Sequence, residues 1–291
     1  MIPTRNRIDL LRRCLDSIFA TTVSSEVDII IVDHESNQSE SVEYIESIRD
    51  KVIIVPYKGV FNYAKMNNYA VNFYKDQQGG LPLYVAFLNN DIEAIEPGWL
   101  EHMRGLARRD DVGVVGATLL YPDDTIQHSG VVIGLVGPAE HANKFLPFKS
   151  GNDRTPGHLG SLVCTRDYSA VTAACMMSRS SVFTEASGFD EQLAVGFNDT
   201  DYCLRVGCLG YKILNDAHAV LRHYESATRS KSGQLLHPED NELFVRRWRR
   251  IIDDGDPWYS PLFSRAADRR MERYADASAK VAVKPGPKRR P

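Results

Sequence analysis

Several features that mark particular classes of protein are missing from this sequence. Its five cysteines include no Cys-x-x-Cys pair, which argues against a zinc site and against a disulfide framework. No run reaches the roughly 18 consecutive apolar residues that cross a bilayer, and the first residues lack the apolar core of a signal peptide. We therefore expect a cytoplasmic protein whose cysteines are small buried side chains in a reducing compartment.

Sequence motifs of several enzyme classes are also absent. The chain contains no Gly-x-Gly-x-x-Gly, no Gly-x4-Gly-Lys-Ser/Thr, no His-Glu-x-x-His and no Gly-x-Ser-x-Gly. Their absence argues against four enzyme classes: dinucleotide-dependent redox enzymes, P-loop phosphotransferases, zincin proteases and serine hydrolases. A formal net charge of −3 gives no reason to expect nucleic acid as a partner.

The overall composition is that of an ordinary globular protein. The 291 residues are 43% hydrophobic and 25% charged, which at this length predicts one large α/β domain, with or without a small appendage. The last dozen residues contain five basic side chains, three prolines and no acid. Such a segment cannot bury enough apolar surface to fold, so we expect a disordered basic tail over residues 276–291.

Short apolar runs alternate with amphipathic stretches over the first two-thirds of the chain. This alternation predicts right-handed crossovers and a mainly parallel sheet covered by helices on both faces. The expected strands span residues 27–32, 52–55 and 83–88. The expected helices are a stripe over 11–19 with Asn6 as its N-cap, a second over 42–48, a third over 62–74, and a fourth that opens at Pro97.

The pattern changes after residue 112. Apolar runs over 114–120 and 125–133 flank a turn-forming Tyr-Pro-Asp-Asp segment and predict a hairpin. Residues 138–168 are rich in Gly and Pro with little periodicity, which favours a long loop or lid. A strand over 171–177 and a helix over 199–209, ended by Gly210, complete the expected elements.

Polar residues that follow the expected strands are the first candidates for a site, because ligands of such sheets bind beyond the carboxyl ends of the strands. Asn89-Asn90-Asp91 follows one apolar strand and fits a divalent cation, which prefers oxygen ligands. The same residues are also typical of a turn, and a turn is the commoner case. The segment that begins at Asp33 follows another strand, and the segment that begins at His223 follows a third.

Two carboxylates lie at the start of the expected helix over 199–209. The helix dipole there favours an ionised carboxylate, as a general base requires. Acidic residues also cap helices, and the pattern alone favours a cap for Asp199 and Asp201.

His223 and Glu225 are two residues apart, so both project to one face of an extended segment. An imidazole there could bind Mn²⁺ or Mg²⁺, and Arg229 could meet a phosphate. Structural histidines are more common than metal ligands, and this applies equally to His128 and His141.

Taken together, these segments resemble family-2 glycosyltransferases of the GT-A fold. More narrowly, they resemble bacterial enzymes of O-antigen, rhamnan and other cell-surface polysaccharide synthesis. The resemblance covers about residues 2 to 264. It rests on these segments, in order: Pro3-Thr4-Arg5, Val32-Asp33-His34-Glu35-Ser36, Phe61-Asn62 with Asn67-Asn68, Asn89-Asn90-Asp91, Gln127-His128-Ser129-Gly130, Thr172-Ala173-Ala174-Cys175, Gly188-Phe189-Asp190-Glu191, Asn198-Asp199-Thr200-Asp201, His223-Tyr224-Glu225-Ser226 and Gly255-Asp256-Pro257-Trp258-Tyr259-Ser260-Pro261.

The sequence departs from this family pattern at two places. Only the last Asp of the family's Asp-x-Asp metal motif is retained, at Asp91, so fewer charged ligands are available to a metal. Of the strand that precedes the Pro-Thr-Arg loop, the sequence has only Met1 and Ile2, so either the chain is a fragment, its start is misplaced, or the first strand is abbreviated.

The resemblance implies an α/β fold of GT-A type with a small antiparallel extension on the acceptor side. It implies a catalytic domain over residues 1–240, a helical extension over 241–275 and the tail over 276–291. The implied activity is inverting transfer of a hexosyl or deoxyhexosyl group from a UDP-, dTDP- or GDP-linked donor. The implied acceptor is a hydroxyl of a glycan or of a polyprenyl-diphosphate-linked glycan, with Mn²⁺ or Mg²⁺ as cofactor.

Site roles carried over from the family fall into five groups. The catalytic base would be Asp199, supported by Asn198 and Asp201. The metal ligands would be Asp91 and His223, and Arg229 would contact the diphosphate. The nucleotide would be bound by Pro3, Thr4, Arg5, Asp33, Glu35, Asn68, Asn89 and Asn90. The sugar or acceptor would be contacted by His128, Thr172, Ala174 and Cys175.

Two other functions compete with this one. A nucleotide-sugar-binding or scaffold module of a larger polysaccharide-synthesis protein would fit the short first strand, but it would need no base and metal together. A sugar-phosphate nucleotidyltransferase would need a Gly-rich, Lys-containing loop near its N-terminus, and the sequence has none.

The basic run over residues 246–250 also has two interpretations. It could form a peripheral contact with the inner face of the membrane or with a lipid-linked diphosphate. A solvated helix face opposite Phe244, Trp248 and Ile251 is the interpretation we favour.

Overall fold

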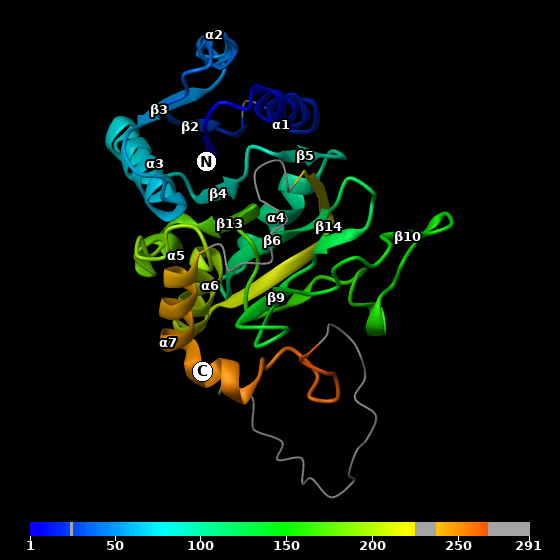
Figure 1. Ribbon diagram of the computed structural model, residues 1–291. Helices are drawn as coiled ribbons and strands as arrows, with labels where there is room; N and C mark the ends of the chain where they lie inside the picture. Colours follow the sequence, from blue (N-terminus) through cyan, green and yellow to red (C-terminus); the bar gives the residue numbers. More distant parts are fainter. Residues whose placement is uncertain (24–25, 225–236, 267–291) are drawn as a thin grey trace, which may run out of the picture.

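The computed structural model describes residues 1–23, 26–224 and 237–266 and has an α/β architecture (Figure 1). The predicted α/β class is therefore confirmed. Strands and helices alternate at the start of the chain, and β1, β2 and β3 pair in parallel in that order. The elements here are β1 (Ile2–Thr4), α1 (Ile8–Thr21), β2 (Ile30–His34), α2 (Ser39–Ser47), β3 (Ile53–Tyr57) and α3 (Tyr63–Gln78).

A second, seven-stranded sheet forms the centre of the molecule. Its main path is β12-β14-β6-β13-β4, with β5 on β14 and β7 on β6. Its members are β4 (Tyr84–Leu88), β5 (Ile92–Ala94), β6 (Val112–Leu120), β7 (Ile126–His128), β12 (Arg166–Asp167), β13 (Cys175–Arg179) and β14 (Lys212–His223).

The second sheet is mixed rather than mainly parallel. Strand β14 runs parallel to β6, whereas β13 is antiparallel to both β6 and β4. A parallel neighbour would need a connection that crosses to the other end of the sheet, but the chain between β6 and β13 makes a long excursion and re-enters the sheet at the end where β6 stopped. Backbone hydrogen bonds join the two sheets, from Met1 N to Ala86 O at 2.7 Å and from Leu88 N to Met1 O at 3.0 Å.

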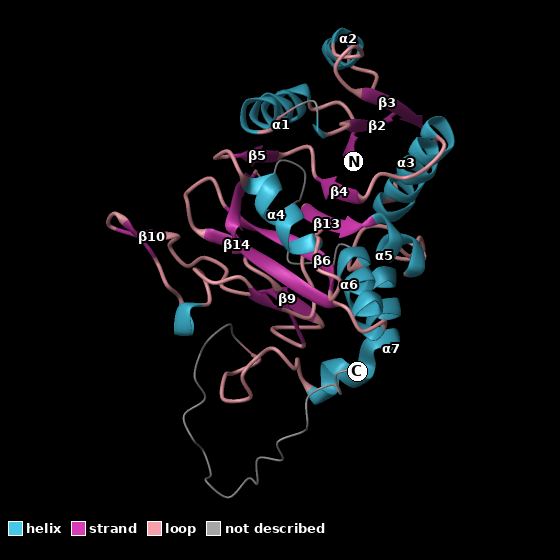
Figure 2. Ribbon diagram, turned by 180° about the vertical axis from the view of Figure 1, so that it is seen from behind, coloured by secondary structure: helices cyan, strands magenta, loops and turns pink. Residues whose placement is uncertain are grey.

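Helices cover both faces of the sheets, as the sequence predicts. One core packs against α1, α2 and α4 (Trp99–Ala107), and the other against α3, α5 (Ser180–Glu185), α6 (Asn198–Cys208) and α7 (Pro238–Asp254). Helices α5, α6 and α7 lie side by side in both views (Figures 1 and 2). Phe244 of α7 is fully buried in the second core. The expected domain boundary after residue 240 falls in the first turn of this helix.

The chain after β6 makes the predicted turn but not the predicted single strand. Asp124 N donates to Tyr121 O at 3.0 Å, which closes the turn. Beyond β7, Gly130 has a φ of 110°, and a Cβ there would lie 2.4 Å from the Tyr168 ring. The chain bends at this glycine, and β8 (Val131–Ile133) pairs with β9 (Ala139–His141) instead of with β6.

The segment expected as a loop over 138–168 contains short elements. Besides β9 and β12, it holds β10 (Lys149–Ser150), β11 (Asp153–Arg154) and a short 3-10 helix (His158–Gly160). Strand β13 begins four residues later than expected, because Val171 is a buried loop residue packed against Gly116.

The predicted N-cap of the first helix is wrong. Arg7 occupies the cap position of α1, in a left-handed conformation and without a side-chain cap bond. The Asn6 side chain instead accepts hydrogen bonds from the backbone N–H groups of Asn37 at 2.9 Å and Gln38 at 3.1 Å. It thereby fastens the loop after β1 to the loop after β2.

The expected tail over 276–291 lies outside the described residues. Among the helices that the structure does describe, none combines the length and the apolar character needed to cross a bilayer.

Candidate active site

The ends of β1, β2 and β4 bring several of the predicted nucleotide-binding residues together. The parallel register places Pro3 opposite Val32 and Thr4 opposite Asp33. Asn90, which follows β4, donates from Nδ2 to Thr4 Oγ1 at 2.9 Å. The predicted residues Pro3, Thr4, Arg5, Asp33 and Asn90 therefore lie at one edge of the joined sheets, as expected for the ends of neighbouring parallel strands.

The loop after β2 is held in a defined shape. Asp33 Oδ1 accepts the Ser36 N–H at 3.2 Å, and Glu35 has a φ of 52°. His34 is 2% exposed, and its Nε2 lies 2.7 Å from Gly59 O. These contacts place the Asp33 and Glu35 carboxylates on a fixed backbone.

Asp91 and His223 meet, as predicted for a metal pair. Asp91 follows β4 and His223 ends β14, and His223 Nε2 is 3.0 Å from Asp91 Oδ1. The backbone N–H of Tyr224 donates to Asp91 O at 2.9 Å, which holds the two segments side by side. Asn89 adds its Nδ2 at 3.4 Å from the same His223 nitrogen.

Gln127 of β7 fixes the orientation of the His223 ring. Its Oε1 is 2.6 Å from His223 Nδ1, and its Nε2 is 3.5 Å from His223 O. Because the Nε2 end of the amide faces a carbonyl oxygen, the Oε1 end is the acceptor and His223 Nδ1 carries the hydrogen. The other ring nitrogen is thus directed at Asp91. Sequence reasoning did not assign this role to Gln127.

This donor set fits a divalent cation. An imidazole nitrogen whose other ring N–H is held by a protein oxygen is the usual arrangement of a metal-bound histidine. No cluster of three or more His, Cys, Asp or Glu that could hold a metal occurs among residues 1–23, 26–224 and 237–266. Further ligands would have to come from phosphate oxygens and water, as is common for Mg²⁺.

Asp199 lies in the first turn of α6 and faces the loop before β13. Its Oδ2 accepts the Ala173 N–H at 3.0 Å, and its Oδ1 accepts from Thr200 N at 2.7 Å and Thr200 Oγ1 at 3.2 Å. All three donors belong to the protein, and the side chain lies at the N-terminal end of the helix. The next residue of that loop, Ala174, accepts the Asn89 N–H at 3.0 Å. Residues 173–174 therefore connect Asp199 to Asn89, which contacts His223 of the Asp91–His223 pair.

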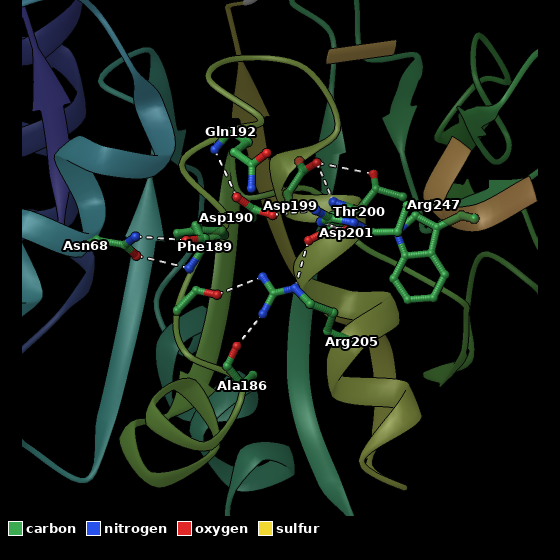
Figure 3. Close-up of polar contacts among 12 residues, drawn as sticks. Asn68, Ala186, Phe189, Asp190, Gln192, Asp199, Thr200, Asp201, Arg205 and Arg247 are labelled. Carbon is green, nitrogen blue, oxygen red and sulfur yellow. Dashed lines mark hydrogen bonds and ion pairs between the residues drawn. The ribbon is translucent and has the colours of Figure 1, made fainter. Parts of the chain in front are cut away.

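Asp201 has a different environment from Asp199 (Figure 3). It is fully buried, and its Oδ2 accepts from Arg205 Nε at 2.8 Å. Its Oδ1 accepts from Arg247 Nη1 at 2.7 Å and from Trp248 Nε1 at 2.9 Å. Asn198 is also buried and donates to Val195 O at 3.0 Å. Both residues support the start of α6 and are enclosed by protein.

The basic run on α7 is not a uniform solvated face. Arg247 points inward and binds Asp190 as well as Asp201. Arg249 pairs with Asp253 one turn on, with both side chains largely exposed.

Three of the predicted ligand contacts need correction. Both ends of the Asn68 amide bind the Phe189 backbone, with Nδ2 2.8 Å from its O and Oδ1 3.0 Å from its N (Figure 3). Cys175 is 1% exposed and packs in the first core, where burial raises the pKa of its thiol. His128 is fully buried and bound to protein at both ring nitrogens.

The His128 ring holds the loop before β13. Its Nδ1 is 2.7 Å from His141 Nδ1, and its Nε2 accepts from Gly130 N at 3.3 Å and Thr172 N at 3.5 Å. Burial and the neighbouring His141 and His223 hold the pKa of His128 well below its usual value, so the ring is neutral. Thr172 in turn accepts the Ala174 N–H on its Oγ1 at 3.3 Å. Arg229 lies outside the described residues.

Comparison with known proteins gives one family and several relatives. The model of the glycosyl transferase family 2 matches residues 1–181. An uncharacterized protein, y4gI of Sinorhizobium fredii, is 38% identical over 272 residues. The O-antigen biosynthesis protein RfbC of Myxococcus xanthus is 34% identical over 287 residues. The chain spans 28% and 22% of the length of these two relatives, and the alignments cover 90% and 98% of the chain.

Solved structures share the fold at low sequence identity. GalNAc-T7 with UDP, GalNAc and Mn²⁺ aligns with a TM-score of 0.63 at 12% identity, over 87% of this chain and 48% of that one. The mannosyltransferase PcManGT of Pyrobaculum calidifontis, in complex with GDP-Man and Mn²⁺, aligns with a TM-score of 0.56 at 14% identity, over 87% and 63%.

Proposed function

The chain belongs to glycosyl transferase family 2, and from this membership we propose that it is a metal-dependent, inverting enzyme of cell-surface polysaccharide synthesis. It would move a hexosyl or deoxyhexosyl group from a nucleotide-diphosphate sugar to a hydroxyl of a glycan or polyprenyl-diphosphate-linked acceptor. The observation that carries the proposal is the pairing of Asp91 with His223 at 3.0 Å, joined through the backbone of Asn89 to the loop that binds Asp199.

Asp91 and His223 would hold Mn²⁺ or Mg²⁺ at the strand ends. When bound, the cation stabilises negative charge on the leaving diphosphate, a Lewis-acid role. The chain contributes ligand orientation: Gln127 holds the ring of His223, and the Tyr224 N–H holds the backbone of Asp91. The two structural neighbours were crystallised with Mn²⁺, which supports a divalent ion of this kind.

The nucleotide would lie along the edge formed by β1, β2 and β4. Thr4 and Asn90 form one polar pair there, and Asp33 and Glu35 present carboxylates that can accept ribose or base donors. Pro3, Arg5 and Asn89 flank them. The two structural neighbours hold UDP and GDP-Man, so UDP-, dTDP- and GDP-sugars are the donors to test.

Asp199 would act as the general base. Its carboxylate accepts three hydrogen bonds from the protein, of about four that a carboxylate can accept. The remaining position can take the proton of the acceptor hydroxyl. As that oxygen attacks the anomeric carbon, the new glycosidic bond forms and the bond to the diphosphate breaks. The electron pair of the broken bond leaves with the nucleoside diphosphate, and the proton passes to Asp199.

Thermal unfolding with UDP, dTDP, GDP and CMP, each with and without Mn²⁺, tests the donor site. A ligand at 100 times its Kd adds about 2.7 kcal/mol to the free energy of unfolding. We expect stabilisation by one nucleotide class that requires Mn²⁺ and is lost in Asp91→Ala. The control is Asp76→Ala, which removes an exposed carboxylate from α3. A folded protein that no nucleotide stabilises in the presence of Mn²⁺ would contradict the proposal.

Release of nucleoside diphosphate from the matching nucleotide sugars then tests the chemistry. We expect turnover that depends on Mn²⁺ and on Asp199.

A further inference from the structure

Helix α7 contacts the segment that carries Asp199. The helix lies outside residues 1–181, which the family model matches. Its side chains at positions 240, 244, 247 and 248 have the i, i+4, i+7, i+8 spacing that places residues on one face of a helix. Each of the four contacts residues 194–201. We call these four residues the α7 clamp.

The first contact of the α7 clamp is made by Asp240. Its carboxylate accepts three consecutive backbone N–H groups, from Ala194 at 3.2 Å, Val195 at 2.9 Å and Gly196 at 2.7 Å. Asp240 is only 5% exposed. The loop that leads into α6 is therefore fixed by its main chain.

The second contact is aromatic and holds the residue before α6. The Phe244 ring stacks on the Phe197 ring, with centroids 4.6 Å apart and planes 15° apart. Phe197 has a φ of 59°, a left-handed conformation that is costly for a bulky residue. Packing on a fully buried Phe244 explains how this sharp bend persists immediately before the helix.

The third contact is made to Asp201 by Arg247 and Trp248, which share its Oδ1. Trp248 itself departs from helical geometry, with a φ of −107° and a ψ of 17°, so α7 is distorted where it meets Asp201. Arg205 occupies the other carboxylate oxygen and also donates to Gly188 O at 2.8 Å and to Ala186 O. Asp199 lies between the Phe197 and Asp201 contacts in sequence.

We propose that the α7 clamp positions the Asp199 carboxylate for proton abstraction, so that residues 240–248 complete the active site. The four residues are positioning residues, because they act through segment 194–201. The inference rests on the proposed role of Asp199 as the base. Small displacements matter at such a group, since a shift of about 1 Å can cost on the order of 10²-fold in rate.

Three variants of the full chain test the proposal, with a neighbour on the same helix as control. Trp248→Phe keeps an aromatic ring but removes the Nε1 donor, and Arg247→Gln removes the charge. Arg249→Gln changes the same residue type two positions on, at a side chain that is 70% exposed and pairs only within α7 in the described contacts. Arg247→Lys tests whether charge without the planar guanidinium restores function.

The first readout is amide hydrogen exchange of a peptide covering residues 194–204, which reports local opening without any substrate. We expect exchange at least about tenfold faster in Trp248→Phe and Arg247→Gln, with exchange in β6 and β13 unchanged. Arg249→Gln should match the wild type. Unchanged exchange of this peptide in both folded variants would overturn the proposal even if the enzyme's donor were still unknown.

The second readout separates kcat from donor binding. We expect kcat to fall on the order of 10²-fold, the Kd of the stabilising nucleotide with Mn²⁺ to stay within about twofold, and Arg247→Lys to recover only part of the loss. An equal loss of nucleotide binding would overturn the positioning role. Failure of the base assignment is seen separately, as an Asp199→Asn variant with full activity.

Discussion

The two sides of the candidate site are built differently. On the donor side, Asn90 binds Thr4 and Asp91 meets His223, and the partners that hold the His223 ring, Gln127 and Asn89, are neutral amides. On the base side, Asp201 alone receives three side-chain donors and is fully buried. On the proposed function, a diphosphate and a cation would bring their own charges to the donor side, whereas the proposed base would be held by the protein alone. The buried ion pairs accordingly lie on the base side, between Asp201 and two arginines.

The largest effect should come from the base itself. Asp199→Asn keeps the size of the side chain but cannot take the proton, so transfer should fall about 10²–10⁴-fold, which is the usual contribution of general base catalysis. The stabilisation of the protein by nucleotide with Mn²⁺ should be unchanged, because the substitution alters no residue of the donor side. Initial rates and thermal shifts on the same preparation check this, with Asp253→Asn as the control. Near-normal transfer by a folded Asp199→Asn protein would remove the basis for separating the two sides.

The next largest difference is expected in the free energy of unfolding, which substitutions on the two sides should lower by different amounts. Asp201→Ala leaves two arginines without their buried partner, which we expect to lower the free energy of unfolding by about 3–5 kcal/mol. Asp33→Ala on the donor side loses one backbone hydrogen bond and should cost about 1 kcal/mol. Urea denaturation of both variants measures the difference. Equal losses would mean that the base side is no more tightly held than the donor side.

A smaller effect is expected for the orientation of His223. Gln127→Leu removes the acceptor of the His223 Nδ1–H and should weaken Mn²⁺ binding about 10–100-fold, as is typical for such supporting residues. Electron paramagnetic resonance of free Mn²⁺ gives the affinity directly. Gln77→Leu on the exposed side of α3 is the control, and affinity equal to wild type in Gln127→Leu would show that the ring needs no support.

The smallest effect concerns pH. The unfolded chain protonates His128 near its ordinary pKa of 6.5, whereas the folded protein holds that pKa far lower. The unfolded state therefore binds more protons at His128 below pH 6.5, so the contribution of His128 to stability should fall there by up to about 1.4 kcal/mol per pH unit and stay constant above it. His128→Gln should reduce that slope, and His102→Gln at an exposed site should not. Urea midpoints between pH 5 and pH 8 decide between these outcomes.

The sequence predicted the donor side better than the base side, for a physical reason. Strand ends converge at one edge of a sheet, so Asp33, Asn90, Asp91 and His223 could be placed together from chain order alone. The contact between Gln127 and His223 spans 96 residues, and no local pattern indicates it.

The direction in which a side chain points also could not be predicted from the sequence. The run over residues 246–250 has four arginines around Trp248, yet Arg247 points inward while Arg249 is exposed. Asn68 and Cys175 matched the family by residue type, but one is bound to the Phe189 backbone and the other lies in the core. The residue type predicts what chemistry a side chain can perform, and packing decides whether that side chain faces the site or the core.

The α7 clamp has a consequence for anyone who trims or transplants this fold. A polypeptide cut where the family match ends, at residue 181, would lose both Asp199 and the helix that holds it. A cut after residue 240 would keep Asp199 but discard Phe244, Arg247 and Trp248. A unit that keeps the proposed base together with the α7 clamp therefore has to include α7, because the two are separated in sequence and in contact in the fold.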